Sequence, residues 1–120
     1  MDEESLNLRE LQRYLTRVGD RWALDGALVG GARVDDAKGA GPQRERGPEW
    51  IVILISEAFA GLPWLERVYI AGSLWDASEM QAHADIHCYT PGEFERKLET
   101  LPIVRRVRER GIDLLAAGAA

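Results

Sequence analysis

Hydrophobic residues recur at intervals of three and four near the start of the chain, a period that predicts an amphipathic helix. The repeat covers residues 5–18, where leucines, Tyr14 and Val18 share one face. Ser5 or Asn7 can cap this helix, because both residue types accept hydrogen bonds from the free N–H groups of a first turn. Gly19 and Asp20 follow it and end it.

Short apolar runs predict the strands of a sheet. Residues 50–56 read Trp-Ile-Val-Ile-Leu-Ile-Ser and are apolar on both faces, which is typical of a central strand covered on both sides. Residues 23–29 and 84–89 predict two further strands, and 112–115 an edge strand. Residues 116–120 are small and terminal, and we expect them to be frayed.

Three more helices are expected between and after these strands. In residues 62–75, Trp64, Val68, Ala71 and Trp75 fall on one face and predict a buried stripe. Thr90-Pro91-Gly-Glu93 has the spacing of a capping box with proline at the first helical position. Residues 103–110 predict a last short helix, which Gly111 ends.

Residues 32–48 combine five glycines and prolines with charged residues and show no clear period, so they predict a mobile loop. The expected fold class is therefore α/β (α+β), a small mixed β-sheet with helices packed mainly on one face. At 120 residues, we expect one domain, with residues 1–20 forming its N-terminal helix.

Charge and composition narrow the possible functions. Twenty acidic against 15 basic residues give a net charge of −5, which argues against a protein that coats nucleic acid. The single cysteine excludes an internal disulfide. No apolar run approaches the roughly 20 residues of a membrane span, and residues 1–5 are acidic where a signal peptide is basic. We therefore expect a cytoplasmic protein without a membrane partner.

Three segments resemble a known family. They are Ser-Glu-Ala-Phe-Ala-Gly-Leu-Pro-Trp-Leu-Glu-Arg-Val at 56–68, Ala-Asp-Ile-His-Cys-Tyr-Thr-Pro-Gly-Glu-Phe-Glu-Arg-Lys-Leu at 84–98, and Ile-Val-Arg-Arg-Val-Arg-Glu-Arg-Gly-Ile-Asp-Leu-Leu at 103–115. Together the segments resemble the small stand-alone nucleotidyltransferases with a DNA-polymerase-β-like fold, over about residues 23–115. The resemblance implies transfer of a nucleoside monophosphate from a nucleoside triphosphate to a hydroxyl, with Mg²⁺ or Mn²⁺ as the cofactor. It also implies a nucleotide and a small helical protein as partners.

The family's active site places a Gly-Ser turn near an Asp-x-Asp strand, with a third carboxylate on a later strand. By resemblance, the turn corresponds to Gly30 and Gly31, which would seat the nucleotide, and the third carboxylate to Asp85. Asp-x-Asp corresponds to Glu49-Trp50-Ile51, so Glu49 and Asp85 would be the catalytic and metal-binding carboxylates. Ile51 stands where the family has a metal ligand, and an apolar side chain cannot bind a cation. We expect the chemistry to be impaired or lost.

Other interpretations of the same residues remain open. Ser73, Asp85 and His87 fit a second register of the family motif, in which residues 69–73 form a strand. His83, Asp85 and His87 alternate, so on a strand they share a face and could bind Zn²⁺ or Mn²⁺ in a metal-dependent hydrolase. Alternatively, the chain is a non-catalytic module that binds a nucleotide or a partner protein.

Some charged residues carry both a structural and a functional interpretation. Asp35 and Asp36 could replace a missing metal ligand or be solvated. The arginines of residues 105–110 form either a solvated face or a weak nucleic-acid contact.

Cys88 is expected on the face opposite Asp85, buried and inert.

Overall fold

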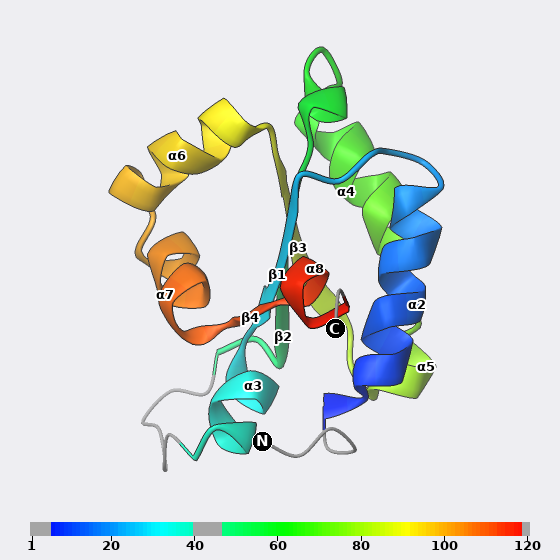
Figure 1. Cartoon of the computed structure of the whole chain (residues 1–120), viewed down its shortest axis with the longest axis vertical. Coiled ribbons are helices and arrows are strands. Elements are labelled where there is room, and N and C mark those ends of the chain that lie inside the picture. The colour runs from blue at the N-terminus through cyan, green and yellow to red at the C-terminus, as the bar shows by residue number, and fades with distance from the viewer. Residues whose placement is uncertain (1–5, 40–46, 119–120) are drawn as a thin grey trace.

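A four-stranded sheet with helices on both faces forms the molecule (Figure 1). The computed structural model describes residues 6–39 and 47–118. The strands are β1 (Gly26–Gly30), β2 (Trp50–Ile55), β3 (Ala84–Tyr89) and β4 (Ile112–Asp113). The helices are α2 (Leu8–Gly19), α3 (Ala32–Ala37), α4 (Trp64–Ser73), α5 (Ala77–Met80), α6 (Pro91–Thr100), α7 (Pro102–Arg110) and α8 (Leu114–Gly118), with a 3₁₀ turn at Glu57–Phe59.

The sheet is mixed, with strand order β3-β2-β1-β4. β1 pairs antiparallel with both β2 and β4, whereas β2 pairs parallel with β3. Parallel neighbours need a long crossover connection, and α4 and α5 lie within the connection between β2 and β3. The predicted mixed sheet and fold class are confirmed.

Alternation along β2 divides the interior into two hydrophobic clusters, one on each face of the sheet. Trp50, Val52 and Leu54 belong to the α2–α4 core, which also contains residues of α2 and α4. The α6–α7 core is smaller and consists of Ile51, Ile53, Tyr89, Phe94, Leu98, Val104 and Val107. Successive side chains of a strand point to opposite faces, which explains why a continuous apolar strand supplies both.

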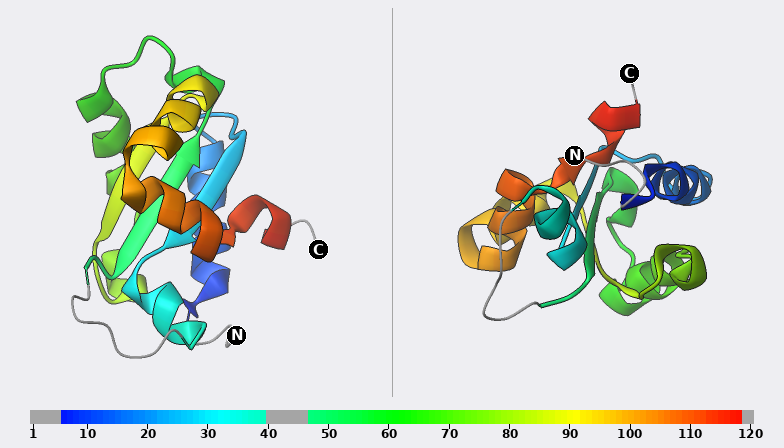
Figure 2. Two further views of the ribbon diagram at one scale, coloured as in Figure 1. Left: turned by 90° about the vertical axis from the view of Figure 1, so that its left-hand side faces the viewer. Right: turned by 90° about the horizontal axis from the view of Figure 1, so that it is seen from below.

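The helices divide between the two faces, which corrects the expectation that they pack mainly on one. α2, α4 and α5 lie on one side of the sheet, and α6 and α7 on the other (Figures 1 and 2). The apolar sides of α6 and α7 carry four of the seven residues of the α6–α7 core. A strand that is apolar on both faces requires this second cover.

Local signals set most element boundaries. The Asn7 side chain caps α2 by accepting a hydrogen bond from the Glu10 N–H, while Ser5 lies outside the described residues. The capping box of α6 is present: Thr90 Oγ1 accepts from the Glu93 N–H, and the Glu93 carboxylate accepts from the Thr90 N–H. The strand predicted at 23–29 instead occupies Gly26–Gly30.

Three predictions fail in detail. The predicted loop 32–48 begins with the helix α3, whose Ala32 and Val34 are buried, and residues 40–46 lie outside the described part. The predicted frayed end contains α8 up to Gly118, with 119–120 not described. Trp64 is 41% exposed instead of buried. α4 begins at Trp64, not at residue 62, which places this side chain at the rim of the core.

Candidate functional site

The sheet aligns three of the residues predicted for the active site. Ile51 on β2 is the register partner of Gly30 on β1 and of Asp85 on β3. These residues therefore form one row across the sheet, the Gly30–Ile51–Asp85 row. Glu49 precedes β2 by one residue, so it lies beyond this row.

Gly31 has a conformation that requires glycine. Its φ is +107°, and a Cβ there would lie 2.6 Å from the Glu49 carbonyl oxygen. This close approach lets the N–H groups of Ala32 and Arg33 donate to the carbonyl oxygens of Pro48 and Glu49, at 3.0 and 3.1 Å. Two backbone donors at the start of α3 are therefore already used within the protein, where the resemblance implies contacts to phosphate.

Glu49 is held by an arginine of α3. Arg33 Nε donates to its carboxylate at 2.6 Å, and both side chains are partly exposed. The guanidinium also lies 5.8 Å from the centre of the Trp50 ring. A cation that bound Glu49 would compete with the positive charge of Arg33.

Ile51 is 6% exposed and belongs to the α6–α7 core, beneath the helices. It also reaches a pocket of about 240 Å³ whose lining includes Gly30, Gly31, Asp35 and Arg106. Arg106 Nη2 donates to Asp35 at 3.1 Å within it. The predicted carboxylates Glu49 and Asp85 do not belong to the lining of this pocket, so it does not bring together the residues predicted for the active site.

Asp85, His87 and Tyr89 form a hydrogen-bonded chain along β3. His87 Nε2 lies 3.2 Å from the Asp85 carboxylate, and His87 Nδ1 lies 2.7 Å from the Tyr89 hydroxyl. A neutral imidazole with its proton on Nε2 satisfies both contacts, because it donates to Asp85 and accepts from Tyr89. Burial, and secondarily the charge of Asp85, raises the pKa of Tyr89 to about 12, so its hydroxyl stays protonated as the donor.

The predicted zinc or manganese set is not assembled. His83 is exposed and precedes β3, whereas both ring nitrogens of His87 already have partners. Across residues 6–39 and 47–118, no three His, Cys, Asp or Glu side chains are placed to hold a metal ion together. The second register of the motif is also wrong, because Ser73 ends the helix α4 and its hydroxyl donates to the Ile70 carbonyl.

Sequence reasoning missed a partly buried ion pair between α4 and α6. Arg67 is 6% exposed and donates to the Glu93 carboxylate at 2.6 Å and to the Cys88 carbonyl at 3.1 Å. Hydrogen bonding from Arg67 holds the pKa of Glu93 below its usual range. The capping box explains the presence of Glu93 in the sequence, so no sequence signal indicated that this carboxylate also pairs with Arg67. That contact becomes visible only in the structure, where Arg67 is buried. Cys88 is buried as predicted, and burial raises its pKa to about 12.

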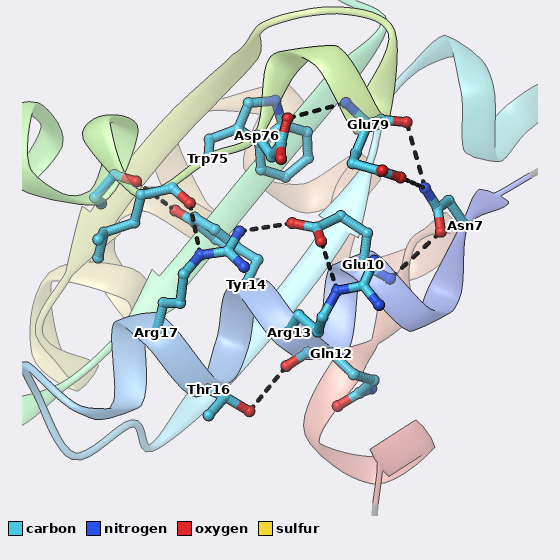
Figure 3. Close-up of polar contacts among 12 residues, drawn as sticks. Asn7, Glu10, Gln12, Arg13, Tyr14, Thr16, Arg17, Trp75, Asp76 and Glu79 are labelled. Carbon is cyan, nitrogen blue, oxygen red and sulfur yellow. Dashed lines mark hydrogen bonds and ion pairs between the residues drawn. The ribbon is translucent and has the colours of Figure 1, made fainter.

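A buried carboxylate lies on α2 (Figure 3). Glu10 is 3% exposed, and Arg13 and Arg17 donate to its two oxygens at 2.8 and 2.6 Å. Arg17 Nε also donates to the Leu74 carbonyl, which fixes α2 against the end of α4. Burial alone would raise the pKa of Glu10, but the two arginines lower it. With both oxygens bound, this cluster is structural.

In the described part of the chain, no helix is both long and apolar enough to cross a membrane.

No protein-family model and no curated protein sequence matches the chain. Among solved structures, the fold is similar to the crystal structure of a "putative nucleotidyltransferase" from Sulfolobus solfataricus, with a TM-score of 0.56. The match covers 92% of this chain and 82% of the other at 13% identity, and it therefore establishes a nucleotidyltransferase-like fold.

Proposed function

We propose that this chain is a nucleotidyltransferase-fold protein in which nucleotidyl transfer is impaired or lost, and which acts as a binding module for a nucleotide or a partner protein. The observation that carries the proposal is the position of Ile51. It occupies the centre of the Gly30–Ile51–Asp85 row and packs under α7. The similarity of fold supports the comparison with a nucleotidyltransferase but does not bear on the chemistry.

The donor set does not fit a Mg²⁺–nucleoside triphosphate site. Mg²⁺ requires oxygen ligands in near-octahedral geometry, and transfer needs a metal held between carboxylates and phosphate. Of the predicted ligands, Glu49 is paired with Arg33 and Asp85 contacts His87. Ile51 offers no donor atom.

The first experiment incubates the protein with ATP labelled at the α-phosphate, in Mg²⁺ and then in Mn²⁺. We expect no label on the protein itself or on an added hydroxyl acceptor. The control is the Asp85→Asn variant. Repeated turnover by the wild type that this variant loses would overturn the proposal, because it would show intact transfer with a catalytic role for Asp85.

A second experiment distinguishes two alternatives: a nucleotide-binding cleft that lacks only one carboxylate, and a fold that serves as a scaffold without such a cleft. Ile51→Asp restores the missing carboxylate, and Ile51→Asn is the control of matched size and polarity without a charge. Both variants lose apolar burial, so their unfolding in urea is compared first. Mg²⁺-dependent ATP binding in Ile51→Asp alone would indicate a cleft that is otherwise complete. Equal, absent binding in both folded variants would favour the scaffold.

A further inference from the structure

An open pocket of about 680 Å³ lies between the start of α4, the end of β3 and α6. Its lining includes Trp64, His87, Tyr89, Glu93, Arg96 and Lys97. We refer to it as the Trp64 pocket. Its volume is in the range of sites for small organic molecules. It shares no residue with the Gly30–Ile51–Asp85 row.

Aromatic rings form one side of this pocket. Trp64 packs against Tyr89 with ring centres 5.4 Å apart and a tilt of 33°, and against the edge of His87 at 6.3 Å. The hydrogen bonds that His87 makes with Asp85 and Tyr89 hold two of these rings in place. Trp64 is 41% exposed, so a substantial part of the indole remains available for stacking with another ring.

Positive charge lines the side formed by α6. In the described part of the chain, the side chains of Arg96 and Lys97 have no hydrogen-bond or ion-pair partner. The carboxylate of Glu93 does not offset them, because Arg67 and the Thr90 N–H bind it. Two cations without an ion-pair partner among the described residues therefore lie beside the aromatic side of the pocket.

We propose that the Trp64 pocket binds a small planar aromatic molecule that carries an anionic group. The aromatic ring stacks on Trp64, and the anionic group, a carboxylate or a phosphate monoester, pairs with Arg96 and Lys97. Arginine and lysine bind both groups through charge-assisted hydrogen bonds. The proposal is independent of whether nucleotidyl transfer is lost.

The test follows the indole N–H signals of the four tryptophans by two-dimensional NMR while a probe is added. Phenyl phosphate and indole-3-acetate distinguish a phosphate from a carboxylate, and benzyl alcohol is the neutral control. We expect a saturable shift of the Trp64 signal, assigned with Trp64→Phe. The indoles of Trp50 and Trp75 donate to backbone carbonyls inside the protein and serve as internal references.

Substitutions then test the charges. Arg96→Gln and Lys97→Gln are each expected to weaken binding about tenfold, equivalent to ~1.4 kcal/mol. Arg108→Gln, an exposed arginine on α7 outside the pocket, should leave binding unchanged. The proposal is overturned if neither probe gives a saturable Trp64 shift at millimolar concentration. It is also overturned if benzyl alcohol binds as well, or if Arg108→Gln weakens binding as much as the pocket variants.

Discussion

At the residue scale, pairing with opposite charges explains why this small protein can bury charged side chains. Glu10 and Arg67 lie in the interior, and each is bound by partners of opposite charge. A buried charge is tolerated only when it is paired and hydrogen-bonded. The sequence did not reveal the pairing of Glu10, because this residue lies three and seven positions from its arginines on a helix whose periodic signal came from the apolar face alone.

Glu10→Gln tests this pairing. At neutral pH we expect a loss of about 1–3 kcal/mol in the free energy of unfolding, because hydrogen bonds to a charged acceptor become neutral ones. The arginines hold the folded-state pKa of Glu10 below its ordinary 4.5. Its contribution is therefore complete above that pH and is lost as the pH falls through the lower folded-state value.

Urea unfolding at neutral pH and near pH 3 measures both effects. The difference in stability between wild type and Glu10→Gln should shrink at the acidic pH. Glu95→Gln, at an exposed position of α6, is the control and should differ little from wild type at either pH. A gap between wild type and Glu10→Gln that stays constant with pH would contradict the role given to the carboxylate.

At the level of elements, the sequence predicted well where the signal is local. The strand Ala84–Tyr89 and the start of α6 were predicted at their observed positions, because alternation and a capping box lie within a few residues. α3 was missed, because its six residues are too short to establish a period. The contacts that stabilise α3 come from Pro48 and Glu49, on the far side of residues 40–46.

Thr90→Ala tests the capping box. We expect a loss of about 1 kcal/mol in the free energy of unfolding, because the Glu93 N–H loses its side-chain acceptor. Thr100→Ala removes the same atoms from the other end of α6, where the hydroxyl donates only to the Arg96 carbonyl. Chemical denaturation of both variants makes the comparison. Equal losses would mean that the cap does not determine the stability of α6.

At the scale of the whole molecule, one sheet separates two hydrophobic cores. The register of its strands determines which residues of the predicted active site lie next to each other. The sequence predicted that Gly30, Glu49 and Asp85 lie near one another, and the register brings Gly30 and Asp85 to opposite sides of Ile51. It could not predict that Arg33 binds Glu49 or that Tyr89 binds His87, because those contacts depend on side-chain directions. The Trp64 pocket was missed for a related reason: helical periodicity placed Trp64 in the core.

Ile53→Ala and Leu54→Ala compare the two cores at adjacent, fully buried positions of β2. Each should lower the free energy of unfolding by about 2–5 kcal/mol. Because both faces share β2, we expect one cooperative transition in each variant. Trp22, Trp50 and Trp75 belong to the α2–α4 core, so tryptophan fluorescence reports mainly on that core, whereas circular dichroism reports on all helices. Transitions that separate between the two probes would show that the faces unfold independently.

The shortness of β4 also bears on how copies of this chain meet in concentrated solution. In the described part of the chain, only Ile112 and Asp113 pair with β1 at that margin before the backbone turns into α8. This edge strand therefore offers few unpaired backbone N–H and C=O groups with which a strand of a neighbouring molecule could pair. Short edge strands are one way in which natural sheets resist fibril growth. The opposite margin, β3, is longer but carries the half-exposed carboxylate of Asp85. Its negative charge would repel an identical strand laid alongside it in register.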